Sequence, residues 1–295
     1  MKIQSLSIVV PNKRCVNDCE FCVAKMSCND YVNQMDDNLP FFDLYLEDYL
    51  KALKFARHNG CNTAMLTGNS EPQQNRKFLT YFGMFMRMMQ DPFEWIELQT
   101  TGVMLDRNYL RFLRNHVGVK TISLSLSSLD SDRNAAFVNM PAHQKVDIEK
   151  LCAEIREYDF TLRLSLNLTN AFLEYHSNPQ DLFAACKRLG ANQVTLRTLY
   201  ADGNETKQAN WVSNFAMRPD QTKVFDDFVV NNGKPLGRLP YGYRKFGIAG
   251  MCVVSDADSM SKDESKQDKE NYKYLILQPD CKLYSQWDDP ASLIF

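Results

Sequence analysis

The stretch Cys15-Val16-Asn17-Asp18-Cys19-Glu20-Phe21-Cys22 places three cysteines in a short segment directly after the apolar run 3–10. Cysteine binds metal as the thiolate, and thiolates this close in sequence suit one shared metal site. On a cubane iron–sulfur cluster, three protein ligands leave one iron with an open coordination position. The run 3–10 is apolar and short, as expected of a buried strand, so we place the cysteines in the loop that follows it.

Other uses of these cysteines remain open. A structural zinc site could take Cys28 as a fourth ligand, although zinc motifs usually combine two separated pairs. A redox pair would need only Cys19 and Cys22 and would leave Cys15 unexplained. Disulfides are disfavoured because a chain of 295 residues can bury a large core without them. The open cluster is therefore the favoured interpretation.

Composition limits the class of protein. The net charge of −2 argues against broad nucleic-acid binding, which needs a basic surface. The apolar run 3–10 is too short for a secretion signal and is followed by Pro11, and no apolar run is long enough to span a membrane. Nine cysteines without such a signal predict a reducing, cytoplasmic location.

Strand-like and helix-like segments alternate along the first two thirds of the chain. Strands are expected at 3–10, 63–66, 95–99, 119–126, 161–168 and 193–199. Helices are expected at 44–58, 77–89, 106–115, 147–158 and 179–189. Regular alternation of this kind predicts an α/β fold with a parallel sheet, whose polar groups gather at the carboxyl ends of the strands. After residue 199 the pattern breaks, although strands are still expected at 248–254 and 274–278 and a hairpin turn at 279–283.

The spacing CxxxCxxC after a first strand, with Phe21 before the last cysteine, resembles the radical S-adenosylmethionine (SAM) superfamily. The resemblance implies a partial (β/α)6 TIM-like barrel over residues 1–200, with residues 201–295 as a C-terminal extension. It also implies a [4Fe–4S] cluster on Cys15, Cys19 and Cys22, with SAM bound at the open iron. One electron, from a donor such as flavodoxin or ferredoxin, would cleave SAM to a 5′-deoxyadenosyl radical that abstracts hydrogen from a substrate.

A second stretch, Gly68-Asn69-Ser70-Glu71-Pro72, is similar to the GGEP-like loop of that family, although the family usually has Gly-Gly-Glu. The resemblance implies that Glu71 and the carbonyl groups around Gly68, Asn69 and Ser70 hold the SAM ammonium. Gly68 would let the backbone approach closely. Taken alone, the stretch could be an ordinary turn, because Gly, Asn, Ser and Pro are common turn residues.

Five further positions are carried over from the resemblance. The run Ser128-Leu129-Asp130 resembles the molybdenum-cofactor cyclase branch, and it implies that Ser125 and Ser127 touch the SAM ribose and carboxylate. The ends of the fifth and sixth strands would bring Asn167 and Arg197 to the adenine and carboxylate, and the backbone at Phe21 would lie near adenine. Without the resemblance, the serines could form a layer of small residues that fills the barrel. Arg197 could form a surface ion pair, and Phe21 could be part of the core.

The C-terminal extension, residues 201–295, is called the tail below, and its composition bears on the substrate. It offers only Cys252 and Cys281, so we expect no second cluster there. We expect it to cover the barrel mouth, and its removal to leave cluster binding in place. Its aromatic and basic residues suit a small or nucleotide-like substrate: Arg238, Tyr241, Tyr243, Arg244, Lys245, Phe246, Tyr284 and Trp287. A peptide or protein side chain is the second substrate class, and a non-enzymatic zinc- or iron–sulfur-binding scaffold is the alternative to an enzyme.

Overall fold

A computed structural model describes residues 2–12, 14–26, 43–201, 205–238, 244–256, 271–287 and 289–295. In these ranges the strands form one mixed sheet with the order β11-β10-β1-β2-β3-β4-β5-β6-β9-β8-β7. Their bounds are β1 Lys2–Val9, β2 Thr63–Thr67, β3 Trp95–Thr100, β4 Thr121–Leu126, β5 Thr161–Leu168, β6 Gln193–Thr198, β7 Lys234–Arg238, β8 Arg244–Ile248, β9 Met251–Asp256, β10 Asn271–Leu277 and β11 Leu283–Tyr284.

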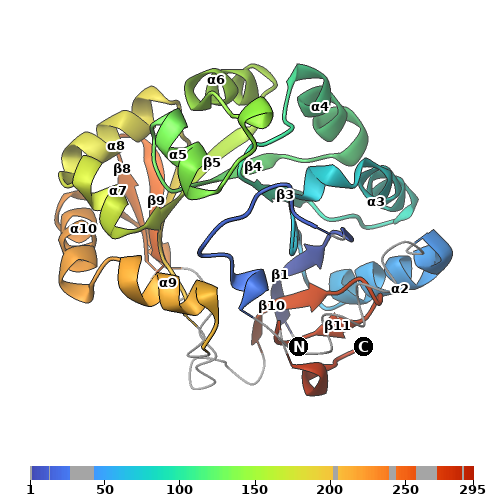
Figure 1. The fold of residues 1–295 in the computed structure, drawn as a ribbon. Helices are drawn as coiled ribbons and strands as arrows, with labels where there is room; N and C mark the ends of the chain where they lie inside the picture. The colour runs from blue at the N-terminus through green and yellow to red at the C-terminus, as the bar shows by residue number, and fades with distance from the viewer. Residues whose placement is uncertain are drawn as a thin grey trace.

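Helices surround the strands on the outside of the curved sheet (Figure 1). The α-helices are α2 Leu46–His58, α3 Arg76–Met88, α4 Arg107–Phe112, α5 Ser131–Phe137, α6 Ile148–Glu157, α7 Asn170–Tyr175, α8 Pro179–Arg188, α9 Lys207–Phe215 and α10 Pro219–Asn232. A π-helix, η4 Leu113–Val117, continues α4, and short 3-10 helices lie at η1 Val23–Lys25, η3 Pro72–Gln74, η5 Ala142–Gln144 and η7 Pro290–Ser292.

The predicted α/β barrel is confirmed. The six expected strands pair in sequence order and in parallel, from β1 to β6, and the five expected helices are present within a few residues of their predicted bounds. Alternate leucines on β4 and β5, such as Leu124 and Leu164, are buried in the core shared with the outer helices. Strands β11 and β7 form the two edges, so the sheet is open rather than closed into a full barrel.

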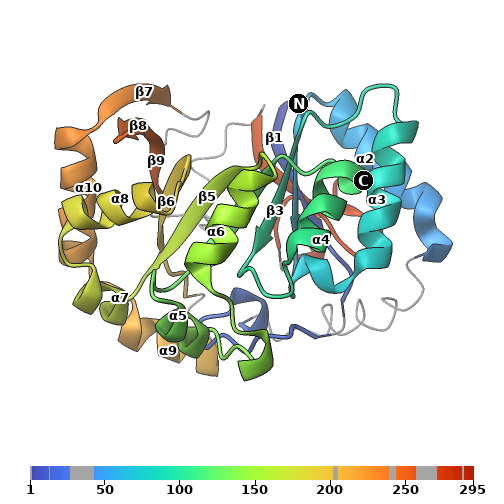
Figure 2. The same cartoon turned by 90° about the horizontal axis from the view of Figure 1, so that it is seen from above.

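Parallel pairing collects the loops that follow the strands at one end of the sheet. Figure 2 shows the segment after β1 at the same end as α5, α7 and α9, which follow β4, β5 and β6. This is the end at which barrel enzymes carry their active sites. The expected positions for functional groups therefore lie together.

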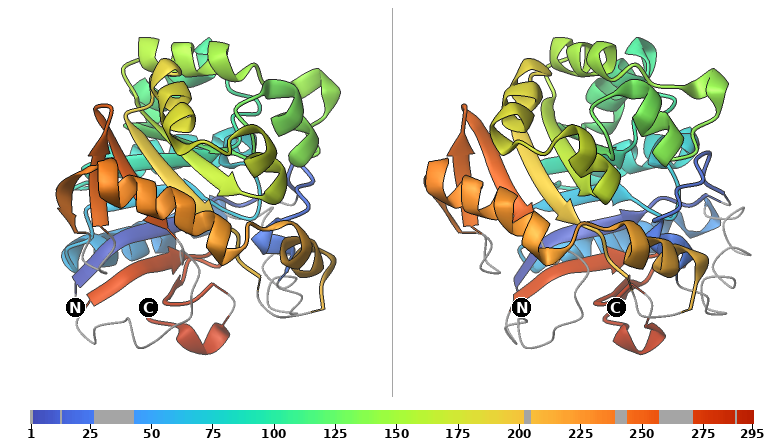
Figure 3. Two further views of the ribbon diagram at one scale, coloured as in Figure 1. Left: turned by 90° about the vertical axis from the view of Figure 1, so that its left-hand side faces the viewer. Right: turned by 60° about the vertical axis from the view of Figure 1, so that its left-hand side comes forward.

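The C-terminal extension adds to this sheet in a way that the sequence analysis did not predict. Strand β10 pairs with β1 in parallel and β9 pairs with β6 in parallel, so the two strands lie at opposite flanks of the six-stranded core. Figure 3 shows β10, in red, along the blue strand β1. The division at residue 200 into barrel and cover stays a prediction.

The aromatic and basic tail residues are divided between two places in the described chain. Arg238 lies in β7 and Phe246 in β8, at one edge of the sheet, whereas Tyr284 lies in β11 at the other edge. Tyr241 and Tyr243 lie outside the described residues. The hairpin predicted at 279–283 is confirmed between β10 and β11, with Cys281 at a φ of 67° where glycine would be usual.

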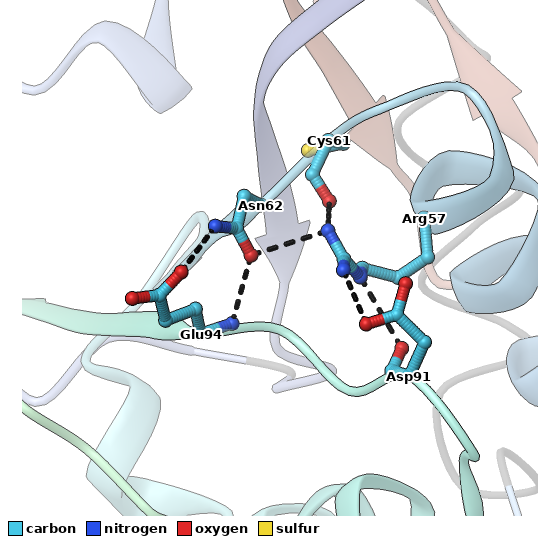
Figure 4. A network of polar contacts seen from close by, with 5 residues as sticks. All are labelled: Arg57, Cys61, Asn62, Asp91 and Glu94. Atoms are coloured by element: carbon cyan, nitrogen blue, oxygen red, sulfur yellow. Dashed lines mark hydrogen bonds and ion pairs between the residues drawn. The ribbon is translucent and has the colours of Figure 1, made fainter.

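At the amino-terminal ends of β2 and β3, one arginine joins three segments (Figure 4). Arg57, at the end of α2, donates from Nη1 to the carbonyl of Cys61 at 2.6 Å and to Asn62 Oδ1 at 3.1 Å. Its Nη2 donates to Asp91 Oδ1 at 2.6 Å, and Asn62 Nδ2 donates to Glu94 Oε2 at 2.6 Å. The network fixes the entry of both strands.

Replacing Arg57 with alanine should lower the free energy of unfolding by about 1–3 kcal/mol, because the partly buried carbonyl of Cys61 and the amide of Asn62 lose their donor. Denaturant titration of the purified protein measures the change. Lys51→Ala on the same helix is the matched control, because Lys51 pairs with Asp48 in an exposed i,i+3 ion pair and its loss should change little. Equal stability of the Arg57→Ala protein and the wild type would contradict the role of this network.

Within the described ranges, no helix combines the length and the apolar character needed to cross a membrane.

Candidate functional site

The cysteine loop leaves β1 and is held against the segments that follow β3 and β4. The amide of Asp18 donates to the carbonyl of Val138 at 3.1 Å, and Asn139 Nδ2 donates to the carbonyl of Asp18 at 2.8 Å. Val16, Cys19 and Phe21 pack against a small buried cluster of Val103, Val138 and Met140. The loop therefore has a defined place at the carboxyl end of the sheet.

Cys15, Cys19 and Cys22 are free thiols, and each is half-buried. Burial raises the pKa of all three, and the negative charge of Glu71 adds to the rise for Cys15 and Cys19. The isolated thiols are therefore protonated at neutral pH. Metal ligation requires the thiolate, so a bound metal group would displace these protons.

The cysteines fit a cluster better than a single ion. No three His, Cys, Asp or Glu side chains among the described residues converge as ligands of one metal ion. A zinc site needs such convergence, whereas each thiolate of a cubane cluster binds a different iron. Cys28, the fourth ligand of the zinc alternative, lies outside the described residues.

Glu71, at the end of the loop after β2, is only 4% exposed, and its carboxylate is surrounded by donors of its own chain. Oε1 accepts from Asn17 Nδ2 at 3.2 Å, from the amide of Thr101 at 3.0 Å and from Thr101 Oγ1 at 2.5 Å. Oε2 accepts from Gln73 Nε2 at 2.7 Å and from Thr100 Oγ1 at 2.6 Å. The sequence analysis placed an ammonium before this carboxylate; in the structure its acceptor sites are directed to these donors.

The residues around Glu71 also bind the cysteine loop through its backbone. Val16 donates its amide to Gln74 Oε1 at 3.0 Å, and Gln74 Nε2 donates to the carbonyl of Arg14 at 2.8 Å. Asn75 Nδ2 donates to the carbonyl of Pro11 at 2.6 Å, and Asn12 Nδ2 donates to the carbonyl of Glu71 at 3.2 Å. The loop after β2 and the cysteine loop thus form one connected unit.

At Gly68 the loop after β2 passes close to the end of β1. The φ of Gly68 is 153°, and a Cβ at this position would lie 3.2 Å from the amide nitrogen and 3.3 Å from the carbonyl oxygen of Val10. A side chain here would crowd the end of β1. Of its neighbours, Asn69 is exposed, and Ser70 carries a buried Oγ that has no hydrogen-bond partner among the described residues.

Three predicted residues, on β4, directly after β4 and on β5, do come together. Asn167 Nδ2 donates to both Ser125 Oγ and Ser127 Oγ at 3.2 Å. Arg197 is the register partner of Asn167 on β6, and its Nε is buried without a hydrogen-bond partner in the described part of the chain. These side chains lie on the sheet face opposite the leucines that pack under the helices.

Helix α9 closes over the cysteine loop from the other side. Phe21 lies 5.8 Å from Trp211 between ring centroids, and Lys207 Nζ lies 2.9 Å from Glu20 Oε2. Met26, Ala209 and Val212 form a buried cluster beneath this contact. The ring of Phe21 therefore packs between α9 and the cluster around Val138, and a role beside adenine stays a prediction.

Buried polar atoms without a hydrogen-bond partner indicate whether this end of the sheet suits a polar cofactor. Ser70 Oγ and Arg197 Nε could each donate to a ligand, and the three free thiols of one loop lie at the same end. A donor beside a bound carboxylate or hydroxyl would meet its hydrogen-bonding need. The residues present therefore fit an iron–sulfur cluster with SAM beside it.

Sequence reasoning missed two groups that shape this site. It gave no role to Thr100 and Thr101, and none to Asn17, although Asn17 lies inside the cysteine motif itself. It also missed α9 and with it Trp211. Helical spacing of Ala209, Val212 and Ala216 was the available signal for the helix, but nothing local indicates which loop it covers.

Several solved structures share this fold. The SAM-bound protein SuiB from Streptococcus suis superposes with a TM-score of 0.57 at 13% identity, over 96% of this chain and 58% of that one. The protein anSMEcpe, bound to AdoMet (SAM), superposes with a TM-score of 0.55 at 17% identity, over 78% of this chain and 61% of that one. The complex of anSMEcpe with AdoMet and the Cp18Cys peptide superposes with a TM-score of 0.51 at 15% identity, again over 78% of this chain and 61% of that one. The chain thus spans about three fifths of the length of these proteins.

No curated protein matches the chain at the sequence level. The family described as the radical SAM superfamily matches residues 9–189, which include the cysteine loop, the loop after β2 and strands β2 to β5. This match covers more than half of the chain and agrees with the open parallel barrel and with the thiols at the carboxyl end of β1. The chain therefore belongs to the radical SAM superfamily.

Proposed function

We propose that this protein is an enzyme that cleaves SAM reductively at a [4Fe–4S] cluster held by Cys15, Cys19 and Cys22. The observation that carries the proposal is the placement of these free thiols at the mouth of an open parallel barrel within the matched family region. When bound, the cluster and SAM supply one electron and a 5′-deoxyadenosyl radical that abstracts hydrogen from a substrate. The chain's own residues bind, orient and shield these groups.

Each part of the mouth has a proposed task. The backbone around Gly68, Asn69 and Ser70 faces the SAM ammonium. Arg197 pairs with the SAM carboxylate, because its buried Nε needs an acceptor. Ser125, Ser127 and Asn167 contact the ribose and adenine as one hydrogen-bonded group.

The inner face of the sheet supports a hydrophilic substrate. Across β4, β5 and β6 the register aligns Ser123 with Arg163 and Gln193, and Ser125 with Ser165 and Thr195. Arg163 is paired with Glu97 at 2.5 Å and also donates to Gln193 at 2.7 Å. Rows of hydroxyl and amide groups favour a polar substrate over a lipid.

The described tail residues that favoured a nucleotide-like substrate are divided: Arg238, Arg244 and Phe246 lie at one edge of the sheet, and Tyr284 lies at the other. A small polar molecule is therefore the leading substrate. A peptide is the second candidate, because the peptide-bound complex of anSMEcpe shares the fold. The molybdenum-cofactor cyclase-like branch stays a prediction.

Electron supply and location complete the proposal. A flavodoxin or ferredoxin would deliver the electron to the cluster. The described cysteines are all free thiols, which suits a reducing compartment such as the cytoplasm.

Anaerobic reconstitution with iron and sulfide tests the proposal. The protein should take up about four irons per chain, absorb visible light, and form 5′-deoxyadenosine and methionine when SAM and dithionite are added. Loss of the visible absorption in air is expected as well. A colourless protein that binds zinc instead and leaves SAM intact would support the scaffold alternative.

A further inference from the structure

Glu71 is the centre of a buried network that joins three loops at the mouth. Its partners come from the cysteine loop through Asn17, from η3 through Gln73, and from the end of β3 through Thr100 and Thr101. Asn17 lies midway between Cys15 and Cys19 in the chain. One carboxylate therefore links two of the three thiol positions to the rigid sheet.

Donor groups of the chain surround this carboxylate. Thr101 Oγ1 accepts from Asn17 Nδ2 at 2.8 Å and donates to Glu71 Oε1 at 2.5 Å. Thr100 Oγ1 accepts from the amide of Gly102 at 2.8 Å and donates to Glu71 Oε2 at 2.6 Å. The remaining contacts are N–H donors from Asn17, Gln73 and the backbone of Thr101. Both oxygens of the carboxylate are therefore held by donors of its own chain.

We propose that Glu71 is a positioning residue for the cysteine loop and sets the potential of its cluster, instead of serving as a ligand of the SAM ammonium. The inference rests on the proposed function, because it assumes a cluster on Cys15, Cys19 and Cys22. Five donors fill the acceptor sites of the carboxylate, and only a different side-chain rotamer would turn it to an ammonium.

The fixed charge has a redox consequence. Reduction transfers one electron from an external reductant to the cluster, taking the core from the 2+ to the 1+ state, so one negative charge is added at the cysteine loop. A buried anion one side chain away from that loop opposes the added charge, because screening is weak away from solvent. Glu71 thus lowers the midpoint potential and makes the reduced cluster a stronger reductant.

Three variants separate the parts of this inference. Glu71→Gln removes the charge and places an amide among donors. Asn17→Ala cuts the bond to the cysteine loop and leaves the charge in place. Glu97→Gln is the matched control, since it removes another buried carboxylate of the same sheet, three residues before Thr100 on β3, whose partner is Arg163.

The measurements are iron content after desalting, midpoint potential by EPR-monitored titration with dithionite, and SAM affinity per cluster. Glu71→Gln should shift the potential in the positive direction and leave SAM affinity per cluster within about threefold of the wild type. Asn17→Ala should lose iron to a chelator faster than the wild type, with an unshifted potential. Glu97→Gln should leave the potential unchanged.

Distinct outcomes overturn the inference and the proposed function. If Glu71→Gln keeps the wild-type potential and loses about tenfold or more in SAM affinity per cluster, the carboxylate is an ammonium ligand and the inference is wrong. If Glu71→Gln does not fold, Asn17→Ala decides: iron retention equal to the wild type overturns the positioning role. A wild-type protein that takes up no four-iron cluster overturns the proposed function and this inference together.

Discussion

Replacing Cys19 with alanine should abolish both cluster binding and SAM cleavage. The change leaves two thiolates, and Cys19 is also the cysteine that packs against Val103 and Val138 at the centre of the loop. Iron content after anaerobic reconstitution should fall to near background, and 5′-deoxyadenosine should not form above the level of a reaction without protein. Cys15→Ala and Cys22→Ala should behave alike.

Cys252→Ala is the control for this prediction. Cys252 lies on β9, is half-buried, and belongs to the tail in which we expect no cluster. Its removal should leave iron content and 5′-deoxyadenosine formation at wild-type levels. A Cys19→Ala protein that retained a full cluster and still cleaved SAM would show that the cluster is held elsewhere.

The double substitution Leu275→Ala and Leu277→Ala in β10 should destabilise the protein by about 4–10 kcal/mol. Both leucines are buried in the main core beside β1, where they are paired in register with Leu6 and Ile8. A loss of this size approaches the whole stability of an ordinary domain, so much of the protein should be unfolded at room temperature. Denaturant titration and iron uptake measure the effect.

Leu236→Ala provides the comparison at the opposite edge of the sheet. Leu236 lies in β7 and is 48% exposed, so its truncation should cost less than about 0.5 kcal/mol. The sequence analysis treated the tail as a cover whose removal would spare the cluster, whereas the pairing of β10 with β1 predicts the reverse. Iron uptake by a well-folded double variant would restore the earlier interpretation.

Local patterns in the sequence predicted much of the fold. The alternation of Ile122-Ser123-Leu124-Ser125-Leu126 separates a core face from a polar face, and the structure shows the same separation. The end of the helix expected at 44–58 was found because Asn59-Gly60, which follows it, is a local stop signal. The carboxyl ends of parallel strands lie at the same end of a sheet. The sequence therefore also predicted that the cysteine loop and the loop after β2 lie together.

Long-range choices could not be predicted in the same way. A strand pattern states which face is buried but not which strand lies beside it, so the positions of β9 and β10 were missed. The orientation of Glu71 depends on Asn17, Thr100 and Thr101, which are far apart in sequence. Each of these residues is unremarkable alone, and only their convergence decides whether the carboxylate faces a ligand or its own chain.

The pairing of β1 with β10 also bears on how the protein folds as it is made. Ser5 donates to the carbonyl of Lys273, a contact between residues 268 positions apart. At about 5–20 residues per second, a ribosome needs roughly 13–54 s to make the 268 residues between these two positions. During that interval β1 has no neighbour on its outer side, and contacts of such high sequence separation form slowly. Strand β1, which leads into the cysteine loop, therefore completes its pairing only after β10 has been made.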